Sequence, residues 1–255
     1  MNHKISVPFL VLACALFSGC ESSRYKPAES LPGSYVRTPP PSLTLTETQL
    51  LERAAAQPAG DVPGDGWKPI FDGTLKGWRA TDFSGGGRVE LVNGLIVIGR
   101  GQPFSGINWT NEPVRTDYEL SLEAMRISGA DFFCGLTFPV RDTYCSLIVG
   151  GWGGSLVGLS SLDGADASEN ETTQFISFET GRWYRIRLRV TAEKIEAWVE
   201  QKKVVNVTTT GRKVALRFGD IEMSKPLGIA AWDTGAAVRE IKLRAISTPD
   251  SPTEQ

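Results

Sequence analysis

A two-residue alternation of apolar and polar side chains, recurring in short segments between residues 65 and 247, is the feature that most constrains this fold. Residues 183–190 read Trp-Tyr-Arg-Ile-Arg-Leu-Arg-Val, so apolar side chains alternate with arginines. This pattern is typical of a strand with one buried and one polar face, and it differs from the 3.6-residue period of a helix. The next segment alternates as well, and we expect its Glu196 and Glu200 to lie opposite the arginines across a hairpin.

Turn residues divide the region into many such segments. Asn93-Gly94 stands between two of them and is typical of a tight hairpin turn, because both residues tolerate positive φ. No strand–helix–strand pattern is present, so we predict one all-β domain over residues 65–247, a β-sandwich or jelly roll of antiparallel strands. The predicted strands are 88–92, 95–98, 117–126, 132–138, 144–149, 183–191, 194–200, 204–208, 227–232 and 238–246.

Composition excludes several kinds of chemistry. The only histidine is His3. It lies in a segment that we expect to be removed, so the mature chain can form no Ser-His-Asp triad and no His-ligated zinc site. Lys and Arg number 27 against 29 Asp and Glu, and without a basic excess we expect no nucleic-acid partner. A reaction must therefore use carboxylates, Lys, Tyr or Cys, or a hard cation bound by oxygen, and no cofactor is required.

The first 20 residues predict export. Lys4 precedes an apolar run over residues 5–17, which is too short to span a bilayer comfortably as a helix. The run ends in Ser-Gly before Cys20, which resembles a bacterial lipobox, where the cysteine is acylated and becomes the first residue. We expect a lipoprotein of the bacterial envelope, periplasm-facing or surface-exposed, that meets the membrane only through lipid on Cys20. An ordinary cleaved signal peptide without lipid is the alternative.

The segment that follows is rich in proline. Proline at the density seen over residues 21–64 favours extended, solvated chain, so we predict a tether there. A short helix is expected within it, started by Thr44 and Glu47 as a capping box. Residues 248–255 are predicted to be a disordered tail.

An unusual loop supplies the main candidate for ligand contact. Four glycines flank Trp152, two on each side, and permit an open turn from which one indole projects. An exposed indole is a suitable platform for a sugar ring, since it offers apolar surface and an N–H donor. The alternative is a tryptophan folded back over a sheet edge. Weaker candidates for substrate binding are Trp109, Tyr144, Trp232 and Asp233.

Carboxylates at loops and strand ends are the candidates for acid–base chemistry. Asp131, Asp142 and Asp163 could converge on one face, as cleavage of a glycosidic bond by two carboxylates requires. The alternative is that they only accept backbone hydrogen bonds at turns. Oxygen ligands are dense in the loop after Leu162, where Asp163, Asp166 and Glu169 would suit Ca²⁺. A solvated acidic loop is the alternative there.

Two cysteines remain within the predicted sandwich, Cys134 and Cys145, on neighbouring predicted strands. An oxidising compartment would allow them to pair. A one-residue shift in register decides whether they share a face of the sheet, so a disulfide and two free core thiols both remain open.

Five segments, in order along the chain, resemble a known family. They read Gly-Trp-Lys-Pro-Ile-Phe-Asp-Gly-Thr-Leu-Lys-Gly-Trp (66–78), Val-Glu-Leu-Val-Asn-Gly-Leu-Ile-Val (89–97), Thr-Asp-Tyr-Glu-Leu-Ser-Leu-Glu (116–123), Gly-Arg-Trp-Tyr-Arg-Ile (181–186) and Val-Arg-Glu-Ile-Lys-Leu-Arg (238–244). Together they resemble the 3-keto-disaccharide hydrolase domain family. The resemblance implies a concanavalin A-like lectin/glucanase sandwich, a carbohydrate ligand and hydrolysis of 3-keto-glycosides.

One segment departs from the pattern of that family. Gly135 and Tyr144 match it, but Cys145 and Leu147 stand where the family has a Glu and a Gln that would point into the sugar cleft. Leucine can neither accept a hydrogen bond nor move a proton. The resemblance therefore implies the fold and the ligand class more strongly than the hydrolase activity.

Three functions fit these observations. The first is an envelope-anchored protein that hydrolyses 3-keto-glycosides by acid–base chemistry. The second is a lectin-like module that binds sugar through Trp152 without turnover. The third is a structural envelope lipoprotein whose cleft is filled by Cys145 and Leu147. None of the three predicts a particular oligomeric state.

Overall fold

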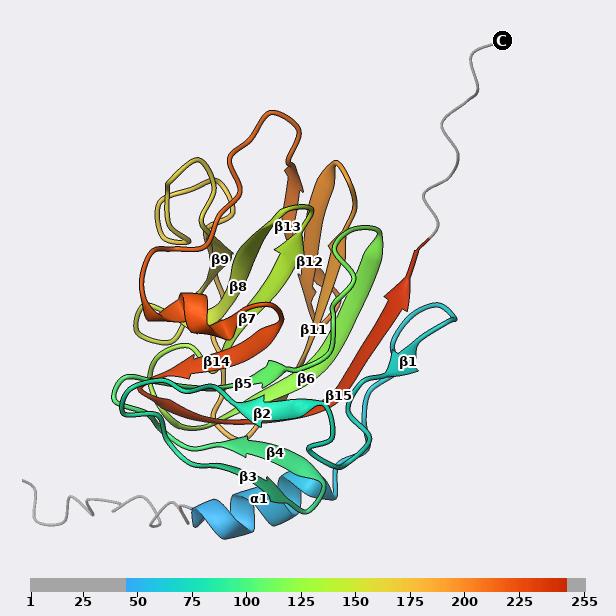
Figure 1. The fold of residues 1–255 in the computed structure, drawn as a ribbon. Coiled ribbons are helices and arrows are strands. Elements are labelled where there is room, and N and C mark those ends of the chain that lie inside the picture. Colours follow the sequence, from blue (N-terminus) through green and yellow to red (C-terminus); the bar gives the residue numbers. More distant parts are fainter. Residues whose placement is uncertain (1–44, 247–255) are drawn as a thin grey trace, which may run out of the picture. The chain divides into compact units, whose positions relative to one another are not determined.

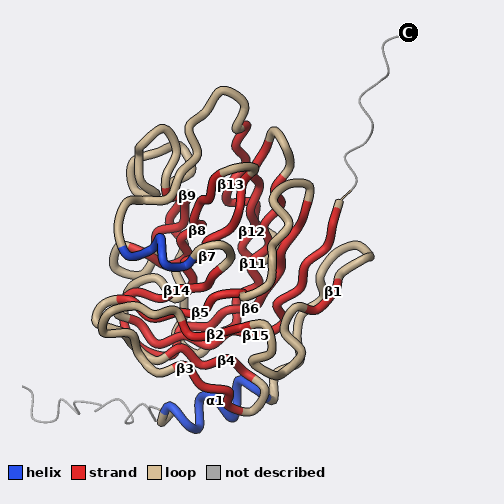
Figure 2. Tube along the Cα trace, viewed as in Figure 1, coloured by secondary structure: helices blue, strands red, loops and turns tan. Residues whose placement is uncertain are grey.

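A computed structural model describes residues 45–246, which lie within one compact unit (Figure 1). The predicted signal peptide with Cys20, the tether up to residue 44 and the C-terminal tail lie outside the described residues. Within residues 45–246 strands dominate, and the helices are α1 (Glu47–Ala55) and the short 3-10 helix η1 (Asp220–Ser224), blue in Figure 2. In this part of the chain, neither helix is long and apolar enough to cross a membrane.

Two antiparallel sheets form a sandwich, as predicted. Sheet A has the order β13-β12-β11-β6-β15-β4-β3, with β1 paired to β15, and sheet B has the order β10-β9-β8-β7-β14-β5-β2. The strands of sheet A are β1 (Lys68–Pro69), β3 (Val89–Val92), β4 (Leu95–Ile98), β6 (Tyr118–Gly129), β11 (Trp183–Val190), β12 (Lys194–Val199), β13 (Lys202–Thr208) and β15 (Thr234–Ala245). The strands of sheet B are β2 (Trp78–Ala80), β5 (Phe104–Trp109), β7 (Cys134–Val140), β8 (Thr143–Gly151), β9 (Leu156–Ser160), β10 (Gln174–Phe175) and β14 (Gly228–Trp232).

Each predicted strand coincides with an observed one, but not every observed strand was predicted. The Asn93-Gly94 hairpin is confirmed, with φ of 52° and 78° at the two turn residues. The strands that the sequence pattern missed include β5 and β9, which are buried along almost their whole length. A strand buried on both faces shows no alternation, so the two-residue pattern cannot reveal it.

The core lies between the two sheets. Ile186, Leu188 and Val190 of β11 are fully buried there, as the alternation predicts. Leu136 and Leu147 of sheet B belong to the same apolar cluster. The arginines of β11 therefore lie on the outer face of sheet A, away from this core.

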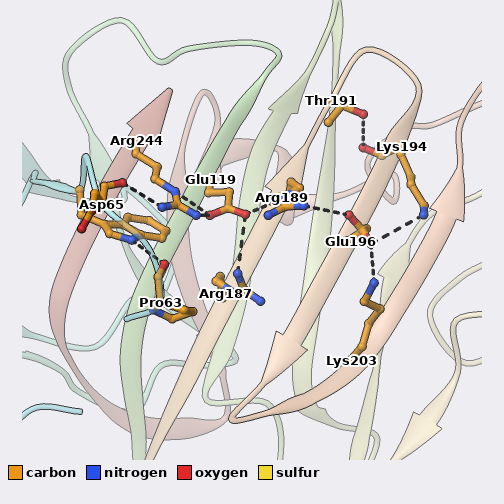
Figure 3. Close-up of polar contacts among 11 residues, drawn as sticks. Pro63, Asp65, Glu119, Arg187, Arg189, Thr191, Lys194, Glu196, Lys203 and Arg244 are labelled. Carbon is orange, nitrogen blue, oxygen red and sulfur yellow. Dashed lines mark hydrogen bonds and ion pairs between the residues drawn. The ribbon is translucent and has the colours of Figure 1, made fainter. Parts of the chain in front are cut away.

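That outer face carries a network of ion pairs, shown in Figure 3. Glu119 of β6 has no exposed side-chain surface, and its carboxylate pairs with Arg189, with Arg187 at 3.7 Å and with Arg244 at 2.5 Å. Glu196 lies in register with Arg189 and pairs with it at 3.7 Å, as predicted for this hairpin. Because the partners stand on neighbouring strands, these contacts tie β15, β6, β11 and β12 together.

Helix α1 covers an apolar part of the same face. Leu51 and Ala54 are buried in a cluster with Trp183, whose indole N–H donates to the Ala54 carbonyl at 3.1 Å. The helix begins two residues later than predicted, because Thr46 and Gln49, rather than Thr44 and Glu47, form the capping box.

The end of the predicted tether is also part of the folded unit. The Gly60 N–H donates to the Glu123 carboxylate at 2.8 Å, and the Arg239 guanidinium donates to the Gln57 carbonyl at 2.7 Å. Residues 45–64 are thus bound to sheet A, although their proline content favours a solvated chain. Composition does not register these hydrogen bonds, so it gives no sign that residues 45–64 lie against sheet A.

The two sandwich cysteines are free and buried, so of the two alternatives left open the structure has the free core thiols. Cys134 lies in register with Val149 and Cys145 with Phe138. The cysteines therefore share the core-facing side of sheet B, but the four positions from 134 to 138 separate them along it, about 13 Å at 3.3 Å per residue. A disulfide needs Cα atoms no more than about 7 Å apart.

Candidate functional site

Loops lie directly on the outer face of sheet B and enclose a pocket. Glycines permit this approach: a Cβ at Gly135 would lie 2.9 Å from the Phe132 ring, and one at Gly158 would lie 2.8 Å from the Ala167 carbonyl oxygen. The pocket between the loops has a volume of about 480 Å³. Its lining residues are Phe104, Asp131, Phe132, Ser146, Ile148, Trp152, Ser160, Asp166, Arg217, Phe218, Gly219, Asp220, Ile221 and Trp232.

Strand β8 forms part of the pocket wall, and its register corrects one expectation. Cys145 and Leu147 belong to the core cluster between the sheets, so they do not reach the pocket. The side chains of β8 that line it are Ser146 and Ile148. The cleft is therefore not filled by Cys145 and Leu147, and β8 presents no carboxylate to it.

Three exposed aromatic side chains stand around the pocket, and we call them the aromatic rim: Trp152, Phe218 and Trp232. They are 44%, 93% and 37% exposed, respectively. Large apolar side chains with this exposure are costly to leave in water, and their gathering at one pocket favours a ligand with apolar surface. The predictions that Trp152 and Trp232 lie at a ligand site are consistent with this placement.

Polar contacts from Asp131 and Arg126 hold the loop that presents Trp152. Trp152 itself has a φ of 48°, in the left-handed region, and is followed by glycines. The Asp131 carboxylate accepts the Gly153 N–H at 3.2 Å, and the Arg126 guanidinium donates to the Gly154 carbonyl at 2.9 Å. Burial lowers the pKa of Arg126. These contacts fix the backbone on the C-terminal side of the indole, so the position of Trp152 is preorganised.

Asp131 lines the pocket, but both oxygens of its carboxylate accept backbone hydrogen bonds. One oxygen accepts the Phe132 N–H at 2.7 Å and the other accepts the Gly153 N–H. This matches the structural alternative that the sequence left open, in which acids at turns satisfy N–H groups.

A second pocket acid, Asp166, holds an arginine. Its Oδ1 accepts the Ser160 hydroxyl at 2.5 Å and the Ala167 N–H at 2.6 Å, and its Oδ2 lies 2.5 Å from Nη1 of Arg217. Asp166 is 15% exposed and Arg217 is 62% exposed. The acid thus fixes one end of a guanidinium that lines the pocket.

The third pocket acid is Asp220, the first residue of η1. It is exposed, and within residues 45–246 its carboxylate has no hydrogen-bond or ion-pair partner. Among the carboxylates of the pocket, it is the one whose oxygens remain open to a ligand.

Two predicted residues lie at the far end of the β7–β8 hairpin. Asp142 is exposed at the tip of the hairpin, whereas Asp131 and Trp152 flank its opposite end. The Tyr144 hydroxyl accepts a hydrogen bond from Arg115 at 2.9 Å. Neither residue lines the pocket.

Two more candidates, Trp109 at the end of β5 and Asp233 directly after β14, lie outside the pocket. Trp109 packs on Trp78, with ring centroids 5.2 Å apart, and is partly buried against the core. Asp233 is exposed and pairs with Arg100 at 2.7 Å, which lowers the pKa of the Asp233 carboxyl. The structure therefore brings together only part of the predicted set.

The acidic loop does not form the predicted calcium site. Asp163 accepts the Lys213 backbone N–H and pairs with Arg212 at 2.5 Å, and these contacts lower its pKa. Asp166 pairs with Arg217 as described. Across residues 45–246, no group of three His, Cys, Asp or Glu side chains could hold a metal ion. Asp163 and Asp166 are bound by arginines instead.

Sequence reasoning missed the segment that closes the pocket, Arg217 to Ile221. Phe218 looks like any core aromatic in the sequence, and the preceding Val214 is indeed buried. A signal was available in Phe-Gly-Asp at 218–220, where glycine and an acid directly follow an aromatic residue, as is common in turns.

Comparisons with known proteins agree with this architecture. Residues 66–244 match the family of 3-keto-alpha-glucoside-1,2-lyase-like domains. Among solved structures, the Crh5 transglycosylase in complex with NAG is similar, with a TM-score of 0.50 and 11% identity over 72% of this chain and 86% of that one. No curated protein matches the chain.

Two further solved structures are more distant. The VIP36 exoplasmic/lumenal domain in its Ca2+/Man3GlcNAc-bound form has a TM-score of 0.49 and 9% identity, over 74% of this chain and 93% of that one. Carbohydrate binding module CBM66 from Bacillus subtilis has a TM-score of 0.44 and 11% identity, over 66% of this chain and 96% of that one. At such identities, similarity of structure concerns the fold alone.

Proposed function

The chain belongs to the family of 3-keto-alpha-glucoside-1,2-lyase-like domains, and on that premise we propose that it binds a glycoside in the pocket on sheet B and cleaves it when the sugar is oxidised at C3. The observation that carries the proposal is the meeting of the aromatic rim, Arg217 and the unpaired Asp220 at one pocket. Aromatic faces suit the C–H surface of a sugar ring. A free carboxylate and a guanidinium at one pocket suit proton transfer with charge stabilisation.

The chemistry needs no histidine. A ketone at C3 makes the proton on C2 acidic, because the charge left by its removal spreads onto O3. In the proposed step Asp220 takes the C2 proton, and Arg217 donates hydrogen bonds to O3 as negative charge develops there. The electrons then form a C1–C2 double bond, the C1–O bond breaks, and the leaving oxygen takes a proton. Addition of water across the double bond completes a net hydrolysis.

Binding without turnover is the second candidate, and a specific observation favours it. Asp131 and Asp166 are already committed to hydrogen bonds within the protein. The pocket therefore has no free pair of carboxylates of the kind that ordinary glycoside hydrolysis uses. In this reading the same aromatic rim holds the sugar, and Asp220 only accepts hydrogen bonds from its hydroxyl groups.

The test is an incubation of the purified protein with a 3-keto-disaccharide and with its unoxidised parent, following released monosaccharide. We expect release from the keto form alone, and Asp220→Asn should lower the rate about 100-fold or more, as loss of a general base does. The matched control is Asp61→Asn, since Asp61 is exposed and lines no part of the pocket. Binding of both sugars without release from either would leave the lectin-like function in place of the enzyme.

Export and anchoring are a separate part of the proposal. Supporting them are the apolar run over residues 5–17 and the Ser-Gly-Cys sequence that ends at Cys20. We expect Cys20→Ser to abolish incorporation of labelled palmitate and to move the protein from the membrane fraction to the soluble fraction. Unchanged membrane association of this variant would contradict acylation at Cys20.

A further inference from the structure

Arg126 of β6 is buried although it is charged. It is 6% exposed, and among residues 45–246 it forms no ion pair with a carboxylate. An arginine keeps its proton at any ordinary pH, so the fold holds a positive charge here without a counter-charge beside it. Burying a charge is costly unless other groups compensate it. The groups that compensate Arg126 show what this side chain does.

Backbone carbonyls take the place of a counter-charge. Four of them accept hydrogen bonds from Nη1 and Nη2 of Arg126, those of Gly154 at 2.9 Å, Asp131 at 3.2 Å, Phe178 at 3.3 Å and Gly150 at 3.4 Å. Gly150 and Gly154 stand on either side of Trp152, at the end of β8 in sheet B, whereas β6 belongs to sheet A. One side chain therefore joins the two sheets and holds both ends of the loop that carries the indole.

Two glycines of that loop leave room for the guanidinium. A Cβ at Gly150 would lie 2.8 Å from Nη2 of Arg126, and one at Gly154 would lie 3.3 Å from the same atom. The two glycines have positive φ as well, 81° and 104°. The glycine pattern that lets Trp152 project therefore also admits the group that holds the loop.

The same guanidinium supports another contact of the loop. The Asp131 carbonyl accepts from Arg126, and the Asp131 carboxylate in turn accepts the Gly153 N–H at 3.2 Å. A lysine could not replace this arrangement, because a single ammonium group cannot reach acceptors that the planar fork of an arginine reaches together.

Arg126 itself does not line the pocket, whereas Trp152 does. The groups assigned to the reaction, Asp220 and Arg217, belong to the chain between β13 and η1 (Figure 1). Arg217 is held there by Asp166 and makes no contact with Arg126. An effect of Arg126 on a bound sugar therefore passes through the Trp152 loop and not through the reacting groups.

We propose that Arg126 is a positioning residue for the ligand, which holds Trp152 where its indole packs on the sugar ring and so sets the affinity of the pocket. This inference rests on the proposed function and adds to it a residue that touches neither the sugar nor the reacting groups. Loss of the guanidinium should raise KM and leave kcat unchanged, since an interaction equally strong in the ground state and the transition state is what it supports.

The experiment measures kcat and KM of Arg126→Lys and Arg126→Met with the 3-keto-disaccharide of the preceding test. We expect Arg126→Lys to raise KM about 3- to 10-fold, and no more than Trp152→Ala does, because the indole is the group through which it acts. The value of kcat should stay within about twofold of the wild-type value. Arg126→Met removes the charge as well and should raise KM at least as much.

A double-mutant cycle with Trp152 separates positioning from a general structural role. In protein that already carries Trp152→Ala, Arg126→Lys should change KM by less than about twofold, since the group that it positions is gone. A merely structural role would produce the same fold-change in both backgrounds.

The matched control is Arg115→Lys. Arg115 also donates to a backbone carbonyl, that of Arg141 at 2.9 Å, but at the opposite end of the β7–β8 hairpin and outside the pocket. This control should leave kcat and KM unchanged.

A second variant reaches the same contact from the loop. Gly150→Ala crowds Nη2 while Arg126 stays in place, and it should likewise raise KM at constant kcat. It carries the test if thermal unfolding shows that a variant of Arg126 does not fold.

The outcomes separate this inference from the function on which it rests. Unchanged KM in the variants, or an equal effect with and without Trp152, overturns the positioning role and leaves the proposed cleavage intact. A fall in kcat at constant KM overturns it too, because Arg126 would then act on the reacting groups. If the wild-type protein binds the sugar without release, dissociation constants from calorimetry replace KM in the same cycle. If it neither binds nor cleaves the sugar, the proposed function fails, and this inference fails with it.

Discussion

Asp166 and Arg217 form an ion pair, with 2.5 Å between Oδ2 and Nη1, in the wall of the pocket on sheet B. The acid comes from the loop after β9 and the base from the chain that leads to η1. The carboxylate also accepts the Ser160 hydroxyl and the Ala167 N–H. Asp166 thus fixes the end of β9, its own loop and the chain segment that carries Arg217.

The two partners of this pair should contribute unequally to stability. Asp166→Ala leaves the Ser160 hydroxyl and the Ala167 N–H without their acceptor, and we expect it to lower the free energy of unfolding by about 1–3 kcal/mol. Arg217→Ala removes a side chain that is 62% exposed, so the expected loss is below about 1 kcal/mol. Urea denaturation of the two variants measures both values. Equal losses would mean that the ion pair, and not the hydrogen bonds to Asp166, stabilises the loop.

The aromatic rim should dominate the affinity for sugar. Trp152→Ala removes an indole that is 44% exposed at the pocket, and we expect binding to weaken by about 0.5–1.5 kcal/mol, up to roughly tenfold in the dissociation constant. Calorimetric titration with the glycoside provides the measurement. Trp67→Ala is the matched control, because Trp67 stacks on Arg244 on sheet A and lines no part of the pocket. A similar loss in both variants would argue against a sugar platform at Trp152.

These residues also show where sequence reasoning succeeds and where it ends. The exposure of Trp152 could be predicted, because the glycines on both sides make that exposure a local property of the sequence. Phe218 could not, since its exposure results from the anchoring of its segment by Asp166 and by Ser161, which are distant in sequence. The ion pairs of β11 were predictable from strand alternation.

The pairing register of the strands set another limit on what could be predicted from the sequence. Asp142 and Asp131 both follow strands in the sequence, and only the pairing of β7 with β8 shows that they lie at opposite ends of a hairpin. The same pairing places Cys145 and Leu147 in the core, whereas the family pattern suggested the cleft. A shift of one residue reverses every side chain of a strand, so motif positions alone do not identify the pocket side of β8.

The carboxylate of Glu119 should be the most sensitive polar group on sheet A. It is fully buried and pairs with three arginines, so Glu119→Gln leaves their charges without the counter-charge. We expect the free energy of unfolding to fall by about 3–5 kcal/mol, as when one partner of a buried pair is removed. Glu90→Gln is the control, since its partner Arg88 is 84% exposed, and it should cost less than about 1 kcal/mol. Chemical denaturation compares the two.

The N-terminal segment should stabilise the sandwich rather than merely tether it. Leu51 is 6% exposed in the cluster that joins α1 to Trp183, and Leu51→Ala should cost about 2 kcal/mol or more. Leu45 lies just before the helix and is 41% exposed, so Leu45→Ala should have little effect. Thermal and urea unfolding test both variants. If Leu51→Ala unfolds like the wild-type protein, residues 45–64 behave as the tether that their composition predicts.

The buried thiols should make stability fall at high pH. Burial raises the pKa of Cys134 and of Cys145 from 9.0 to about 12. Above pH 9 the unfolded chain therefore loses thiol protons that the folded chain keeps, and the folded state loses stability as the pH rises towards 12. Below pH 9 both states keep these protons and the thiols contribute no pH dependence.

The measurement is the free energy of unfolding at several pH values from 7 to 11, for the wild-type protein and for Cys134→Ala/Cys145→Ala. The variant starts lower because of the cavities it creates, but its decline above pH 9 should be shallower than that of the wild-type protein. Other groups titrate in both proteins, so the difference between the two curves isolates the thiols. Parallel curves, or rapid reaction of both native thiols with a thiol reagent at pH 8, would show that the cysteines are not closed off in the core between the sheets.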